Sequence, residues 1–285
     1  MEQLSLRRRL YDRGLRALLY LCGGLVCALL VFLIGYIFVR GLPRITWELV
    51  STQSSMIRGT IGILPHIAST LYIILVTMVI VLPLGVGAAI YLTEYASNRK
   101  LAAIIEFAAE TLTGIPSIIF GLVGMMIFIQ TCGLKAGVLA GSLTLVVMIL
   151  PTIIRTTQES LKTVPQSYRE GALGLGAGKW RMIRTVVLPN SIDGIVTGCI
   201  LAIGRIVGES AVLLYIAGMG TSLNNFLTAK GLFSGSGSTL TVMLYVYAKE
   251  RSDFDLAFAV AVILMVITLL INLSAQLVGK KLKKS

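Results

Sequence analysis

Long apolar stretches separated by short polar gaps run along the whole chain, and this pattern predicts membrane-spanning helices. Pro116 interrupts one of these stretches, and because proline removes a backbone donor we expect a kink there. The fold class that follows is all-α, a polytopic membrane protein with six transmembrane helices. The six stretches, each long enough to cross a hydrocarbon core of about 30 Å, are 17–39, 68–92, 104–131, 136–154, 192–217 and 254–278.

Composition supports the same class. Hydrophobic residues make up 56% of the 285 positions and charged residues 13%, with a mean hydropathy of +0.88. A soluble domain carries about 25% charged residues, so this chain has too little polar surface for a water-soluble globule. The first apolar stretch, 17–39, exceeds the ~7–15 residues of a signal-peptide core. We therefore expect it to be an uncleaved first membrane helix.

Two gaps on the predicted outer side are long, 41–65 and 218–253. The first includes "ITWELV", which could lie in the membrane interface. The second includes the glycine- and serine-rich "GLFSGSGS", typical of a flexible linker, and then "TLTVMLYVY". That last apolar run is too short to span, so we expect a re-entrant or interfacial segment.

The formal net charge of +12 raises the question of nucleic-acid binding. The basic residues occupy the polar gaps and do not gather with aromatic residues, as they would on a nucleic-acid-binding face. We therefore expect no nucleic acid among the partners, and membrane lipid instead. With the N-terminus inside, seventeen bases lie in inner gaps and seven in outer ones, Arg205 being the last of the 25. This asymmetry predicts that both termini are cytoplasmic.

Candidate catalytic and metal chemistry is sparse. The four cysteines form no CxxC pair, and His66 is the single histidine, so the sequence offers no zinc or redox ligand set. No nucleophile–base constellation is visible either. We expect no catalytic residue, no metal site and no cofactor bound by this chain, and a membrane enzyme is the weakest interpretation.

The stretch "GALGLGAGKW", residues 171–180, invites comparison with phosphate-binding glycine loops. A P-loop needs glycine five positions before its Gly-Lys pair and a hydroxyl directly after it. Here Leu173 and Trp180 occupy those positions. A dinucleotide-binding fingerprint fails as well, because Lys179 stands where its third glycine would be. Direct nucleotide binding by this loop is therefore excluded.

The periodicity around this loop indicates two short amphipathic helices within 165–188. One begins after Pro165 with Tyr168, Ala172 and Leu175 on a face, and the glycines at 176–178 end it. A second helix follows, with Trp180, Ile183 and Val187 on one side, and we expect Pro189 to end it. Such a pair is either a plain interfacial element or a projection that docks in a groove of a cytoplasmic partner.

The same residues carry a family resemblance. Glu170-Gly171-Ala172, then Gly176, then Leu188-Pro189 resemble in register the cytoplasmic coupling signature of ABC-importer permeases, except that Gly171 replaces an alanine. That replacement costs a helix about 1 kcal/mol. Longer stretches, among them "GCILAIGRIVGESAVLLY", "GIPSIIFGL" and "YLTEYA", resemble phosphate-transport permeases of the PstA type over roughly residues 60–280.

The resemblance implies a type I, MetI-like permease fold in the cytoplasmic (inner) membrane of a prokaryote. It implies that the coupling helices at 165–188 insert into a cytoplasmic ABC ATPase dimer, on which ATP and Mg are bound. The other implied partners are a homologous second permease and an extracytoplasmic phosphate-binding protein. The chain would then divide into 1–59 (N-terminal segment, first helix and outer loop), a permease core at 60–279, and a basic tail at 280–285.

Two charges lie inside the fifth apolar stretch. Arg205 and Glu209 are four residues apart, so on a continuous helix they share one face. A membrane-buried charge costs about 2.5–3.5 kcal/mol and therefore faces a partner or a water path. The pair either joins helices as a neutral unit or lines a substrate path, with Arg205 gripping an oxyanion and Glu209 holding Arg205. Arg155, placed at the cytoplasmic end of the fourth helix, is an interfacial anchor or, as the resemblance implies, a further anion contact.

Small residues on the same stretch recur every fourth position. Gly194, Gly198 and Ala202 form one such ridge, and Gly204 and Gly208 a second. Since small residues let helices approach closely, we expect contact with a second permease subunit here. Two alternatives to phosphate import stay open at this point: a permease for another oxyanion such as molybdate or sulfate, and a stand-alone anion channel or transporter.

Overall fold

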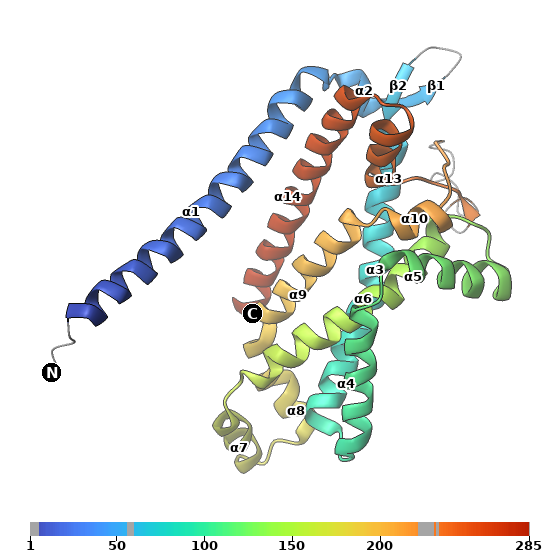
Figure 1. The fold of residues 1–285 in the computed structure, drawn as a ribbon. Helices are drawn as coiled ribbons and strands as arrows, with labels where there is room; N and C mark the ends of the chain where they lie inside the picture. Colours follow the sequence, from blue (N-terminus) through green and yellow to red (C-terminus); the bar gives the residue numbers. More distant parts are fainter. Residues whose placement is uncertain (1–5, 56–59, 222–230, 232–233, 285) are drawn as a thin grey trace.

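The computed structural model describes residues 6–55, 60–221, 231 and 234–284, and these form a bundle of tilted helices (Figure 1). A pair of short antiparallel strands caps the end of the bundle opposite α7 and α8. The long helices are α1 (Leu6–Gly41), α3 (Leu64–Ile90), α4 (Arg99–Thr113), α6 (Val138–Lys162), α9 (Leu188–Gly208) and α14 (Phe254–Lys284). The short elements are α2 (Trp47–Ser51), α5 (Ser117–Gly124), α7 (Gln166–Gly174), α8 (Lys179–Met182), α10 (Ala211–Ile216), α13 (Leu240–Tyr245), β1 (Gln53–Ser55) and β2 (Thr60–Ile63).

Five helical runs in the described residues are long and apolar enough to cross a membrane, and a bent pair makes a sixth. The all-α, six-span prediction therefore holds, with β1 and β2 as a small addition. The bent pair is α4 followed by α5, which meet at an angle of 104°. Pro116 thus breaks the predicted third helix far more sharply than a kink, because α4 ends at Thr113 and the non-helical backbone of Pro116, with a ψ of 136°, starts α5 in a new direction.

Two predicted boundaries are wrong around the fifth span. Pro189 does not end the second short helix, because α8 runs through a π-helical turn at Ile183–Val187 directly into α9. Proline is tolerated there since it lies in the first turn of α9, following the wider π turn. At the other end, the span stops at Gly208 and not at residue 217, because Glu209 adopts extended backbone angles.

Helix α6 forms the centre of the bundle, between α3 and α9. Its side chains Leu145, Ile149 and Ile153 are at most 1% exposed. The contact with α9 is close because a Cβ at Gly194 or Gly198 would collide with the hydroxyl-bearing side chains of α6, at Ser160 and Thr156 respectively.

The predicted role of this first glycine ridge is therefore wrong. It packs on α6 of the same chain, not on a second subunit. A Cβ added at Gly204 or Gly208, which form the second ridge, would meet nothing within 4 Å among the described residues. The expectation of a subunit contact remains a prediction for that second ridge alone.

The short helix α13 corresponds to the run predicted to be re-entrant or interfacial, and it packs inside the bundle. Its N-terminal end is fixed to α3: His66 Nδ1 lies 2.9 Å from Ser238 Oγ, and the Leu240 amide donates to Thr70 Oγ1 over 3.0 Å. The predicted linker before α13, residues 231–238, lies partly outside the described residues, at 232–233.

Helix α1 contacts the bundle near its C-terminal end. There Tyr36 meets Phe258 of α14 edge to face, with ring centroids 5.6 Å apart. Toward its start α1 diverges from the other helices (Figure 1), and the side chains of residues 11–36 are exposed within the described chain. A uniformly apolar helix with that exposure needs lipid or another subunit around it.

Candidate functional site

The break between α9 and α10 is the first candidate site, because it places polar backbone in the middle of an apolar bundle. Glu209 and Ser210 separate the two helices. The Thr241 hydroxyl of α13 donates to the Val207 carbonyl, which the ending helix leaves free. Non-helical backbone at membrane depth is tolerated only where it is buried in protein or lines a water-filled cavity.

A second broken element packs against the first. Gly121 and Gly124 of α5 bring that helix close to α10 and α6: a Cβ at Gly121 would lie 3.2 Å from the Val212 Cα of α10, and one at Gly124 would collide with Thr144 of α6. Both interrupted spans, α4–α5 and α9–α10, therefore meet at one level of the bundle. Discontinuous helices that meet in this way are a recurrent way of building transport sites.

Arg205 lies in the last turn of α9, directly before the break. Its side chain is partly buried, and Nη1 lies 3.4 Å from the Thr152 hydroxyl of α6, a neutral group. The C-terminal end of a helix favours a cation, which helps to hold the guanidinium in this position. Among the described residues no carboxylate lies within 4.0 Å of it, so most of its hydrogen-bonding capacity is unused.

Glu209 does not hold Arg205, and this part of the prediction is wrong. The extended backbone at Glu209 removes it from the helix face that Arg205 occupies. Its Oε1 instead accepts a hydrogen bond of 3.1 Å from the Val212 amide in the first turn of α10. The carboxylate, 9% exposed, thus caps α10, and negative charge is stabilised at that end of a helix.

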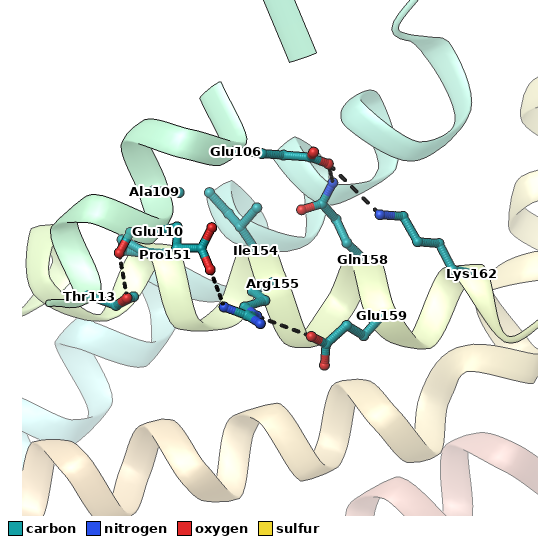
Figure 2. Close-up of a pocket in the computed structure, with 10 residues that line it drawn as sticks. All are labelled: Glu106, Ala109, Glu110, Thr113, Pro151, Ile154, Arg155, Gln158, Glu159 and Lys162. Atoms are coloured by element: carbon teal, nitrogen blue, oxygen red, sulfur yellow. Dashed lines mark hydrogen bonds and ion pairs between the residues drawn. The ribbon is translucent and has the colours of Figure 1, made fainter. Parts of the chain in front are cut away.

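Arg155 occupies a different environment, a cavity of about 230 Å³ between α4 and α6 (Figure 2). It does not end its helix as predicted, since α6 continues for two further turns to Lys162. Its guanidinium contacts two carboxylates: Nη1 lies 3.2 Å from Glu110 Oε1, and Nε lies 3.1 Å from Glu159 Oε1. All three side chains are at least 60% exposed in the described chain.

Two carboxylates of α4, Glu106 and Glu110, line the same cavity, and their contacts were not predicted from the sequence. Glu106 accepts a hydrogen bond from Gln158 over 2.8 Å and lies 3.9 Å from the Lys162 ammonium (Figure 2). Glu106 and Glu110 are one helical turn apart, and this spacing could have indicated a charged face. Their partners on α6 were not visible, because nothing local in the sequence relates the two helices.

The predicted pair of cytoplasmic helices is present as α7 and α8. Gly176 separates them with a φ of +83°, which favours glycine over all other residues. Its amide donates to the Leu173 carbonyl, and the Ala177 amide donates to Ala172, the two bonds of a Schellman cap. The glycine corner is therefore a helix terminator, as expected from the sequence.

The signature residues lie on the projecting end of the bundle formed by α7 and α8 (Figure 1). Glu170, Gly171, Gly176 and Pro189 are exposed, while Ala172 and Leu188 are partly buried. The apolar face of the second helix differs from the prediction: Met182, Ile183 and Val187 are buried, whereas Trp180 is 57% exposed. Together with Leu175, 92% exposed, Trp180 presents apolar surface to a possible partner.

The described residues hold no group of three His, Cys, Asp or Glu side chains that could bind a metal ion. The four cysteines are free thiols. The break presents a guanidinium with one hydrogen bond to a neutral hydroxyl, and α7 and α8 present an exposed helical projection.

Comparison with known proteins identifies the family that this chain matches. The model of the family described as "Binding-protein-dependent transport system inner membrane component" matches residues 82–284. The chain is 36% identical over 221 residues to the "Probable ABC transporter permease protein YqgI" of Bacillus subtilis (strain 168), covering 78% of this chain and 75% of that protein. It is 30% identical over 248 residues to the "Phosphate transport system permease protein PstA" of Mycobacterium leprae (strain TN), covering 86% and 80%.

Two solved structures share the fold. A chain of the MetNI methionine ABC transporter, in an inward-facing conformation, superposes with a TM-score of 0.60 at 23% identity, covering 83% of this chain and 96% of that one. A chain of a bacterial ABC transporter that imports the acidic polysaccharide alginate gives a TM-score of 0.63 at 15% identity, covering 96% and 99%. These likenesses confirm the fold expected from the sequence.

Proposed function

Because the chain belongs to the family of binding-protein-dependent transport system inner membrane components, as a permease of the PstA type, we propose that it carries inorganic phosphate. It would form part of the path through which an ATP-driven importer moves the anion across the cytoplasmic membrane. The chain is a multi-pass inner-membrane permease of an ABC importer.

The observation that carries the phosphate proposal is the state of Arg205. A partly buried guanidinium at a helix break, bonded to one neutral hydroxyl, has the charge and the free donors that an oxyanion requires. It is held loosely, which suits a site that must also release its ion. The names of the relatives, phosphate transport permeases at 30–43% identity, favour phosphate over other oxyanions.

Energy for transport would come from outside this chain. The exposed α7–α8 projection, with Glu170, Leu175 and Trp180 at its surface, fits the groove of a cytoplasmic ABC ATPase that binds ATP and Mg. Alternation of access would then follow closure of the ATPase dimer. A second, homologous permease would complete the path, and an extracytoplasmic phosphate-binding protein would deliver the anion. Both termini would lie in the cytoplasm, as the distribution of basic residues predicts.

The experiment is ATP-driven uptake of labelled phosphate by the reconstituted complex in proteoliposomes. Unlabelled phosphate should compete with the label, while sulfate and molybdate at the same concentration should not. Effective competition by sulfate or molybdate would overturn the phosphate assignment. Uptake without ATP would overturn the ATP-driven mechanism.

Docking is tested in the same complex by Glu170→Arg. A reversed charge at the projection should reduce recovery of the ATPase subunit by roughly tenfold or more, because like-charge contacts cost several kcal/mol at an interface. Glu48→Arg, the same change on exposed α2 at the other end of the bundle, is the control and should leave recovery unchanged. Equal recovery in both variants would contradict docking through α7.

A further inference from the structure

The π-helical turn Tyr91–Tyr95 at the end of α3 contacts both short cytoplasmic helices. Arg169 of α7 donates to Glu94 of this turn twice, from Nε over 3.1 Å and from Nη2 over 3.0 Å. The Lys179 ammonium, at the start of α8, lies 4.9 Å from the centre of the Tyr95 ring. In sequence, α7 and α8 connect α6 to α9, so this attachment to α3 is not required by chain connectivity.

The Arg169–Glu94 pair is largely shielded from solvent, unlike the other ion pairs among the described residues. The two side chains are 12% and 7% exposed, whereas every other paired side chain is at least 45% exposed. An exposed pair contributes little because water screens it. A buried pair keeps its geometry, since either charge left alone in that place is strongly unfavourable.

Arg169 also fastens the end of α6. Its Nη1 donates to the Val164 carbonyl over 2.6 Å, and Nη2 donates to the Leu161 carbonyl over 2.8 Å. All three guanidinium nitrogens are therefore engaged, and they join α7 to the ends of both α3 and α6. A lysine could not reproduce this arrangement, because its single ammonium lacks the planar fork.

Helix α7 makes few other contacts with the bundle. None of its described side chains is fully buried, and Ala172 packs against an apolar cluster that includes Ile90 and Leu161. Arg169 makes the only side-chain hydrogen bonds from α7 to other elements in the described chain. A cavity of about 460 Å³ separates part of α7 and α8 from the π turn, with Leu173 and Met182 among its lining residues. Among the polar contacts of the described residues, Arg169 is therefore the one side chain through which movement of α7 can reach α3.

We propose that Arg169 and Glu94 are a positioning pair that transfers displacement of α7 to α3 during the transport cycle. The proposal rests on the proposed function, in which α7 docks on the ATPase. Displacement passes from α7 through Glu94 into α3. From α3 it passes into α6, against which α3 packs along the bundle core. Glu94 and Arg169 contact no substrate, and their effect is on coupling alone.

The test is the number of phosphate ions transported per ATP hydrolysed by the complete complex in proteoliposomes. Glu94→Gln and Arg169→Gln each remove one charge, and their double variant removes both. The single variants should lower this ratio by about tenfold, within the range of ordinary coupling energies, while ATP is still hydrolysed. The double variant should not lower it further, because the two residues act as one unit.

Arg44→Gln is the matched control, since it breaks an exposed pair with Asp255 at the opposite end of the bundle, 3.1 Å long. Its ratio should equal that of the unmodified complex. If Arg169→Gln fails to assemble, Arg169→Lys carries the test: it keeps the charge, loses the fork, and should still lower the ratio. A normal ratio in Arg169→Lys and Glu94→Gln, or an equal loss in Arg44→Gln, overturns the proposal.

The outcome is separable from failure of the phosphate assignment. If the unmodified complex transports a different anion, the ratio is measured with that anion and the comparison among variants stands. If the complex hydrolyses no ATP in any form, docking on an ATPase is at fault, and the positioning role falls with it.

Discussion

Arg205 and Arg155 were both predicted to line a substrate path, and the structure brings both to the same stretch of α6. Arg205 reaches Thr152, whereas Arg155 lies three residues further along the helix. Their surroundings differ: Arg155 is at least 60% exposed and matched by two carboxylates, while Arg205 is partly buried and matched by none within 4.0 Å among the described residues. We therefore expect Arg205, which has no competing carboxylate among the described residues, to be the more available of the two to an anion.

The largest effect should come from Arg205→Gln. Loss of a bidentate, charge-assisted contact to the anion should reduce phosphate uptake by about a hundredfold or more, with the complex still assembled. Arg205→Lys should be intermediate, because it keeps the charge without the fork. Uptake in proteoliposomes measures the effect of both substitutions. Near-normal uptake in Arg205→Gln would contradict the expectation that Arg205, unlike Arg155, contacts the anion.

An intermediate effect is expected at Glu209, where the structure replaces an ion pair by a helix cap. Glu209→Ala should lower the stability of the complex by about 1 kcal/mol, the usual cost of a lost cap. Glu209→Gln keeps an acceptor for the Val212 amide and should be close to unmodified in a thermal unfolding assay. Equal destabilisation by both changes would mean that the charge of Glu209, and not its hydrogen bond, stabilises the break.

The smallest effect is expected from Arg155→Gln. Exposed ion pairs contribute about 0–1 kcal/mol, so uptake should fall by no more than about fivefold. Glu110→Gln removes one of the two partner carboxylates and should change uptake no more than that. If Arg155→Gln abolished uptake as completely as Arg205→Gln, then Arg155 would have to leave its carboxylates during the cycle to contact the anion.

The features that could be predicted from the sequence are those with local causes. The apolar runs predict the spans because each must cross the bilayer by itself, and the glycine corner follows because Gly176 alone suits a positive φ. The break at Glu209 was missed, since the stretch from 192 to 217 carries no proline, and Gly208-Glu209-Ser210 was interpreted as part of one continuous helix. It arises from tertiary contacts: Thr241 satisfies the carbonyl of Val207, and that hydroxyl lies more than thirty residues away in sequence.

The candidate sites differ in the same way, since one depends on neighbouring residues in the sequence and the others depend on contacts between helices. The coupling residues form one continuous segment, so their grouping could be predicted, and the pattern that identifies them is short-range. The partner of Arg155 on α4, Glu110, and the partner of Arg169 in the turn after α3, Glu94, depend on how helices pack. The spacing of residues along one helix contains no such information. Gly194 and Gly198 are an example of what the spacing cannot predict, because small residues indicate a close approach without indicating which helix approaches.

That close approach has a mechanical consequence. Where Gly194 and Gly198 meet Ser160 and Thr156, no layer of long side chains lies between α6 and α9. Packed helices slide past one another by small rotamer changes in such a layer, and these two helices lack it at this contact. We therefore expect α6 and α9 to move as one rigid body when the path opens and closes, with displacement taken up at their other neighbours.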